Sequence, residues 1–159
     1  MPPTRSLRKY GDPRTPECWN CALEEAVWYA KQTKKAEKCP TQWADFPRPL
    51  CGMLTYINDS MFTDQTEVLL HLVPKLAEVE YDPLLASDDW KPKELQRLHD
   101  QFRVEIGALA TFADQWVYRY AQAKQADNTA QIVELQKLLD KVVIQMVDAT
   151  KNPKPVGTP

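Results

Sequence analysis

Residues 92–150 decide the fold of this chain and read PKELQRLHDQFRVEIGALATFADQWVYRYAQAKQADNTAQIVELQKLLDKVVIQMVDAT. They contain a single glycine, Gly107, and no proline after Pro92. In the second half of the segment, apolar residues recur every three or four positions, so they share one stripe of a helix. These residues are Ile132, Leu135, Leu139, Val142 and Met146. The segment therefore predicts two long helices, joined by a short link at residues 125–128.

The first of these two helices is expected to run from Pro92 to about Lys124. Its apolar stripe consists of Leu95, Leu98, Phe102, Ile106, Leu109, Phe112, Trp116 and Tyr120. Asp127 or Asn128 is suited to cap the second helix, because either side chain can accept a hydrogen bond from an unpaired backbone N–H. A link this short forces the two helices to lie antiparallel, which predicts a C-terminal helical hairpin.

Three shorter helices are expected before the hairpin, at residues 17–37, at residues 49–61, and from cap residues 63–67 to about Val79. The first is expected to bury Leu23, Ala26, Val27 and Ala30, and the second Leu50, Leu54 and Ile57. Pro74 should kink or divide the third, because proline lacks an amide proton and its ring clashes with the preceding turn. The expected fold class is all-α: a five-helix bundle with a long C-terminal antiparallel helical hairpin.

A chain of 159 residues is most simply one domain. Residues 1–16 hold four prolines and a glycine, so we expect a disordered basic arm there. Residues 17–150 are expected to form the single helical domain. Residues 151–159 hold three prolines and a glycine, and we expect a disordered tail.

Composition and charge exclude several function classes. The formal net charge of −2 offers no strong field for nucleic acid or a membrane surface. The four glycines stand alone, which excludes a glycine-rich phosphate loop. No apolar stretch follows the basic N-terminus, as a signal peptide would require, and no apolar run of about 18 residues could span a bilayer. We therefore expect a cytoplasmic protein without a membrane partner.

The four cysteines are the strongest candidates for a chemical site. Cys18 and Cys21 form a C-x-x-C pair. If the first helix forms as expected, Cys39 lies about 31 Å from Cys18, too far to share an ion whose thiolate ligands lie about 2.3 Å away. Cys51 can fold back toward the pair, and His71 can supply a fourth ligand. One hypothesis is therefore a structural zinc held by Cys18, Cys21, Cys51 and His71.

The cysteines have further interpretations. Reduced thiols that pack as small hydrophobic side chains are favoured in a cytoplasmic protein. A disulfide such as Cys21–Cys51 would require an oxidising compartment. A redox role for the C-x-x-C pair is disfavoured, because no strand precedes the motif.

Catalytic constellations are absent from the sequence. His71 and His99 both lie in predicted helices beside apolar stripes, which favours packing roles. The sequence has no Glu-x-x-His pair of a di-iron bundle and no Gly-x-Ser-x-Gly elbow of a hydrolase. We expect a non-enzymatic protein without a cofactor, with a structural zinc as the alternative.

Candidate partner-binding residues occur in two places. The N-terminal arm offers a basic patch for an acidic partner or nucleic acid. Its cations are Arg5, Arg8, Lys9 and Arg14. In the helix that begins at Pro92, Tyr118 and Arg119 point away from the apolar stripe and are expected at the surface. Trp116 and Tyr120 fall on the stripe and are expected in the core.

The segment from Cys21 to Val79 resembles a loose family of short uncharacterised proteins found in actinobacterial and related genomes. The likeness rests on Cys21-Ala22-Leu23-Glu24, Pro49-Leu50-Cys51, Ile57-Asn58-Asp59, and the apolar segment from Leu69 to Leu76 around Pro74. This chain departs from the family in its longer, lysine-rich insertion at residues 31–48. The resemblance implies no activity. It directs attention to Asn58 and Asp59, which either brace a helix end or form a polar contact site.

These features favour a non-enzymatic helical protein–protein interaction module: an adaptor, a regulator, or a small subunit of a bacterial or phage assembly. The expected partner is another protein or a second copy of this chain. The alternative is a zinc-supported or nucleic-acid-binding helical module that uses the cysteines and the basic residues.

Overall fold

The computed structural model describes residues 22–33, 40–42, 45–60, 68–82 and 106–151. Every regular element in these ranges is helical, and none of the described residues lies in a strand, which confirms the all-α class. The elements are α1 (Ala22–Thr33), α2 (Arg48–Ser60), the 3₁₀ helix η3 (Leu70–Leu72), α3 (Val73–Leu76), α5 (Ile106–Gln125) and α6 (Thr129–Lys151).

The first two helices bury the residues that the periodicity selects. Leu23, Ala26, Val27 and Ala30 of α1 are buried, as are Leu50, Leu54 and Ile57 of α2. The predicted ends of the first helix, at residues 17–21 and 34–37, lie outside the described residues. Helix α2 begins at Arg48, one residue before the predicted start, and Pro49 occupies its first turn, where a missing N–H costs no hydrogen bond.

The third predicted helix is shorter than expected. The helix is divided at Pro74, one of the two predicted outcomes: the chain forms η3 and then the single turn of α3, in which Pro74 lies near the N-terminus, and α3 ends at Leu76 instead of Val79. A proline in a helix interior clashes with the carbonyl four residues earlier, so an α-helix cannot continue through this position. A 3₁₀ turn before the proline avoids the clash, because its hydrogen bonds span three residues instead of four.

A tight cap joins α5 to α6. The N–H of Asn128 donates to the carbonyl of Ala123 at 2.9 Å, and the N–H of Asp127 donates to Lys124 at 3.2 Å. This pair of bonds defines a Schellman motif, and Asp127 has the positive φ of 51° that the motif requires. The Oδ1 of Asn128 accepts from the N–H of Gln131 at 3.2 Å, so Asn128 is the predicted N-cap of α6.

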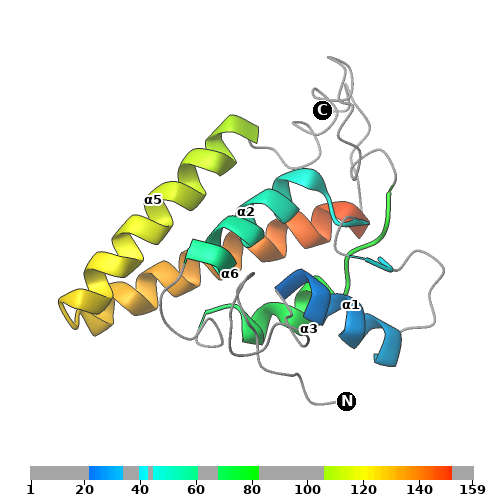
Figure 1. Ribbon diagram of the computed structural model, residues 1–159, viewed down its shortest axis with the longest axis horizontal. Helices are drawn as coiled ribbons and strands as arrows, with labels where there is room; N and C mark the ends of the chain where they lie inside the picture. The colour runs from blue at the N-terminus through cyan, green and yellow to red at the C-terminus, as the bar shows by residue number, and fades with distance from the viewer. Residues whose placement is uncertain (1–21, 34–39, 43–44, 61–67, 83–105, 152–159) are drawn as a thin grey trace.

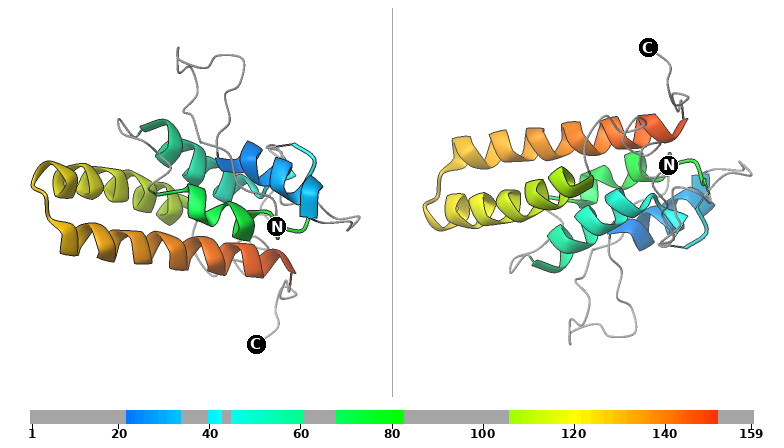
Figure 2. Two further views of the ribbon diagram at one scale, coloured as in Figure 1. Left: turned by 90° about the horizontal axis from the view of Figure 1, so that it is seen from below. Right: turned by 90° about the horizontal axis from the view of Figure 1, so that it is seen from above.

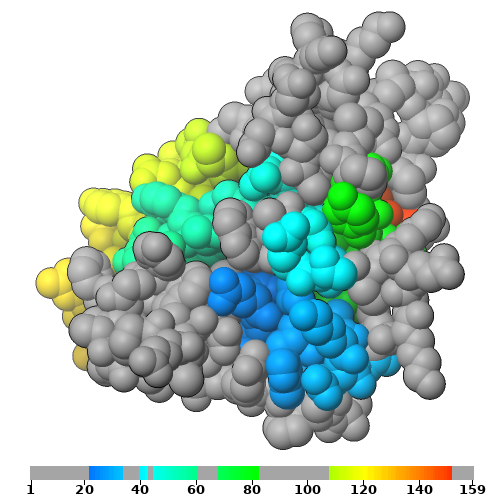
Figure 3. Space-filling view, turned by 45° about the vertical axis from the view of Figure 1, so that its right-hand side comes forward, coloured from blue at the N-terminus to red at the C-terminus, as the bar shows by residue number. Residues whose placement is uncertain are grey.

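The helices surround one core. Helices α5 and α6 lie side by side and run in opposite directions (Figure 1, Figure 2). Helix α2 lies between α5 and α1 (Figure 1, Figure 3), and α3 contacts both α1 and α6. The largest fully buried side chains come from nearly every element and include Trp116, Phe46, Leu54, Leu76 and Leu139.

Four charged side chains link α3 and the residues just after it to α6. The Nζ of Lys75 lies 2.8 Å from Oδ1 of Asp148 and 3.4 Å from Oε1 of Glu78. Lys151 pairs with the same Glu78 oxygen and lies 3.5 Å from Asp148. We call Lys75, Glu78, Asp148 and Lys151 the α3–α6 ion cluster. Because all four are partly exposed, its contribution to stability is modest.

Candidate functional site

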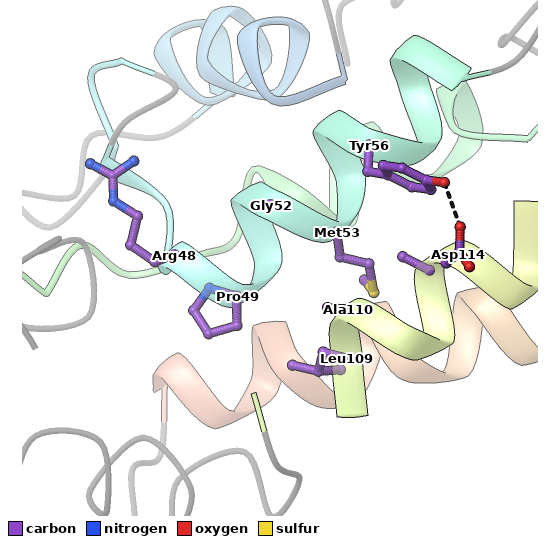
Figure 4. Close-up of a pocket in the computed structure, with 9 residues that line it drawn as sticks. Arg48, Pro49, Gly52, Met53, Tyr56, Leu109, Ala110 and Asp114 are labelled. Atoms are coloured by element: carbon purple, nitrogen blue, oxygen red, sulfur yellow. Dashed lines mark hydrogen bonds between the residues drawn. The ribbon is translucent and has the colours of Figure 1, made fainter. Parts of the chain in front are cut away.

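A pocket lies between α2 and α5, with a volume of about 370 Å³ (Figure 4). Its lining comes from two helices that are far apart in the sequence. Helix α2 contributes Arg48, Pro49, Gly52, Met53 and Tyr56, and α5 contributes Leu109, Ala110, Ala113 and Asp114. On each helix these residues recur at helical spacing, so each set forms one face that turns toward the other helix.

Small residues create the space. Gly52, Ala110 and Ala113 lie where larger side chains would fill the gap between the two helices. A Cβ atom built on Gly52 would meet no atom within 4 Å. The floor is apolar, because Met53, Leu109 and Ala113 are all buried.

The rim of the pocket is open. Gly52, Tyr56, Ala110 and Asp114 are all exposed, and Tyr56 retains 42% of its accessible surface. The pocket is therefore a depression in the molecular surface and not an enclosed cavity.

One end of the pocket is polar. The hydroxyl of Tyr56 donates a hydrogen bond of 2.8 Å to Oδ1 of Asp114, which links α2 to α5 (Figure 4). This bond is the main reason that the pKa of Tyr56 lies above its ordinary value, and desolvation and the charge of Asp114 add to the increase. A hydrogen bond with Ser60 acts in the opposite direction. The hydrogen bond therefore favours the phenol form of Tyr56, which donates to Asp114.

The lining supports binding. Its nine residues are mainly apolar or small, with Arg48, Tyr56 and Asp114 as the polar members. Burial of apolar surface stabilises a bound group by about 25 cal/mol per Å². The arrangement can therefore hold an apolar group and offer it one carboxylate.

Of the four predicted metal ligands, the structure describes Cys51 and His71. Cys51 is buried on α2 with 4% of its surface exposed. The Nε2 of His71 lies 2.9 Å from Oδ1 of Asp140 on α6 and 3.4 Å from the amide nitrogen of Gln136. Cys18 and Cys21 lie outside the described residues. Within the described ranges, no group of three or more histidine, cysteine, aspartate or glutamate residues could hold a metal ion.

The predicted partner-binding residues of α5 lie at the surface. Tyr118 is 64% exposed, and its hydroxyl accepts a hydrogen bond from Gln122 at 2.9 Å. Arg119 is also exposed. Trp116 and Tyr120 are buried and their rings stack with centroids 4.9 Å apart, which confirms their expected place in the core. The basic residues Arg5, Arg8, Lys9 and Arg14 lie outside the described residues.

Asn58 and Asp59 lie in the last turn of α2. Asn58 is fully buried, and its Nδ2 donates to Oδ1 of Asp59 at 3.2 Å. The pair lies outside the lining of the pocket.

Sequence reasoning did not single out the residues that form the pocket. Gly52 and Ala110 have no functional group in the side chain. In the sequence, Asp114 looks like an ordinary surface carboxylate of a helix. The available signal was the run of small residues at helical spacing in α5, Ala110 and Ala113, together with a glycine inside α2.

Comparison with known proteins finds no matching family model, no matching curated protein and no matching solved structure. The resemblance to the actinobacterial family therefore stays a prediction. Among the helices of the described ranges, none combines the length and the apolar character that crossing a membrane demands.

Proposed function

We propose that this protein is a non-enzymatic protein–protein interaction module, and that its α2–α5 pocket receives an apolar segment of another protein chain. The single observation that carries the proposal is an apolar pocket that remains open to solvent between two packed helices. Grooves of this kind bind a segment of a partner through apolar side chains at helical spacing.

The exposed rim favours a protein partner over a small molecule. Small-molecule sites are concave enough to bury roughly 70–90% of a ligand's surface. Here Gly52, Tyr56, Ala110 and Asp114 leave one side open. A polypeptide that crosses the pocket would insert a side chain and also cover this rim, which would exclude water from the contact.

The pocket alone supplies only part of the free energy of binding. Full burial of one large apolar side chain contributes about 1.5–3 kcal/mol. Association costs on the order of 4–15 kcal/mol of lost translational and rotational freedom. One or two side chains in the pocket cannot offset that cost alone, so the contacts around the rim must supply the remainder.

Two alanines of α5 provide a matched test. Ala110 lines the pocket, whereas Ala121 lies three turns further along α5, about 16 Å away, and does not. Both are exposed, so either position should accept a tryptophan without loss of the fold. Ala110→Trp fills the pocket with an indole ring, and Ala121→Trp adds the same ring elsewhere.

The measurement is the native mass of each tagged, full-length chain purified from the cells in which it naturally occurs. The proposal predicts a stoichiometric companion with the unmodified chain and with Ala121→Trp, and its loss with Ala110→Trp. A companion retained by Ala110→Trp would contradict the proposal. So would a complex that contains copies of this chain alone.

A further inference from the structure

The Asp114 carboxylate lies at one end of the pocket, opposite Arg48, and its position restricts the chemistry of the partner. Its Oδ1 accepts a hydrogen bond of 2.8 Å from the hydroxyl of Tyr56. Among the described residues, Tyr56 is the only side chain to which Asp114 is hydrogen-bonded. A carboxylate offers about four acceptor sites on its two oxygens, so this interaction leaves room for a further donor.

We infer that the partner segment carries a lysine beside the apolar side chain that enters the pocket, and that the lysine ammonium binds Asp114. This inference rests on the proposed function, and it specifies which residue of the partner binds at the same pocket.

The other groups of the pocket favour a cation at this end. The ring of Tyr56 lies next to Asp114 (Figure 4). An aromatic face attracts an ammonium group, and its apolar surface can also pack against the methylene groups of a lysine. Arg48 lies at the opposite end of the pocket, and its side chain points away from Asp114 (Figure 4). The apolar part of the segment should therefore lie toward Pro49 and the ammonium toward Tyr56.

Lysine fits this site better than arginine. The planar guanidinium of arginine binds a carboxylate best through two parallel hydrogen bonds, one to each oxygen. The Tyr56 hydroxyl already takes one of the acceptor sites of Oδ1 of Asp114, so a guanidinium that binds both oxygens has to share Oδ1 with it. An ammonium is a compact charge with three donors and can bind Oδ2 alone.

The chemistry can be tested with small probes and the full-length chain. Hexylammonium and hexanol carry the same apolar body, but only the first has a charge at neutral pH. Each is titrated at pH 7 while the amide NMR signals of Gly52, Ala110 and Ala113 are followed. We expect saturable shifts with both probes and a dissociation constant at least threefold lower for hexylammonium.

Two variants show whether Asp114 causes the preference. Asp114→Asn keeps the shape of the side chain and should bind the two probes equally. Glu134→Gln removes the same charge from an exposed position on α6, where the side chain is 75% exposed, and should keep the preference. An equal loss in both variants would show a general charge effect and overturn the inference.

A peptide pair distinguishes a lysine of a protein from a free amine. Acetyl-Leu-Lys-amide should bind at least threefold more tightly than acetyl-Leu-Gln-amide. If hexylammonium is preferred but the two peptides bind equally, the site takes a free amine and the lysine assignment is wrong. If hexanol binds as well as hexylammonium, the cation is wrong while the apolar pocket and the proposed function stand. If no probe shifts these signals, both proposals fail.

Discussion

The indole N–H of Trp116 on α5 donates a hydrogen bond of 2.8 Å to the backbone carbonyl of Leu135 on α6. Trp116 is 2% exposed and is among the largest fully buried side chains among the described residues. Because the bond joins a side chain of one helix to the backbone of the other, it fixes the register of the two helices. It also positions the preceding turn of α5, which carries Ala113 and Asp114 of the pocket.

Replacement of Trp116 should therefore destabilise the fold. Trp116→Phe removes the indole donor and leaves a cavity, and we expect a loss of roughly 2–4 kcal/mol in the free energy of unfolding. Tyr118→Phe is the matched control, since Tyr118 is 64% exposed on the same helix, and it should change stability by less than about 0.5 kcal/mol. Urea unfolding of both variants makes the comparison. Equal losses would contradict the role assigned to Trp116.

Gly52→Ala should stabilise the free protein and weaken partner binding. Gly52 lies inside α2, where alanine is favoured over glycine by about 0.5–1 kcal/mol. The added Cβ meets no atom within 4 Å, so no strain offsets the gain. The same methyl group reduces the pocket that Gly52 lines. The midpoint of thermal unfolding should be higher for Gly52→Ala than for the unmodified protein. A lower midpoint would contradict the absence of strain at this position.

Asp127→Gly should also raise the stability. Asp127 has φ of 51°, a left-handed conformation that costs an L-residue roughly 1–2 kcal/mol and that glycine adopts freely. The greater freedom of glycine in the unfolded chain offsets part of that gain, so we expect a net increase of about 0.5–1 kcal/mol. Asp127→Ala, which keeps the strain, should not stabilise. Equilibrium unfolding in urea distinguishes the two variants.

Acidification should weaken the α3–α6 ion cluster. The hydrogen bond from Lys75 lowers the pKa of Asp148. The pKa of Glu78 also lies below its ordinary value: desolvation, its largest single influence, raises it, but the combined effects of Lys151 and Lys75 outweigh the increase. A carboxylate whose pKa is lower in the folded state than in the unfolded chain stabilises the folded state when the pH is above its unfolded pKa of about 4. This stabilisation is lost as the pH falls through the folded pKa.

The free energy of unfolding should therefore decline below about pH 4. The contribution of this cluster to the decline should be no more than about 1 kcal/mol, because the carboxylates of Glu78 and Asp148 are 41% and 50% exposed. Lys75→Met should flatten this decline. Lys137→Met is the control, because Lys137 is 71% exposed and lies 3.9 Å from Glu134. Denaturation curves from pH 3 to pH 7 give the measurement, and identical slopes for the two variants would refute the assignment.

Hydrophobic periodicity predicted the all-α fold class and most of the buried residues. A helix that buries one face needs apolar residues every three or four positions, whichever element it packs against. Leu135, Leu139 and Met146 of the predicted stripe are buried. Ile132 and Val142 are only partly buried, whereas Val143 and Val147 are fully covered. Helix α6 contacts both α5 and α3, so its buried face is wider than one stripe. The sequence pattern could not reveal this second contact.

The pocket could not be predicted, because it depends on where two distant helices meet. Tyr56 and Asp114 are 58 positions apart, and each alone reads as an ordinary surface residue. Their proximity, like the gap above Gly52, follows from the packing of α2 on α5. The sequence predicted that Pro74 would kink or divide the helix, and which of the two occurs depended on whether the chain could form a 3₁₀ turn before the proline.

Site-specific photocrosslinking in the cell tests the central claim most directly. A benzophenone side chain is placed at Thr111, an exposed residue beside the pocket that leaves the lining unfilled, or at Ala121, further along α5. We predict that Thr111 yields one crosslinked product with a second protein, and that the crosslinked peptide contains a lysine next to a large apolar residue. Ala121 should yield much less of this product. Equal crosslinking at both positions, or none at Thr111, would contradict the assignment of the α2–α5 pocket as the partner-binding site.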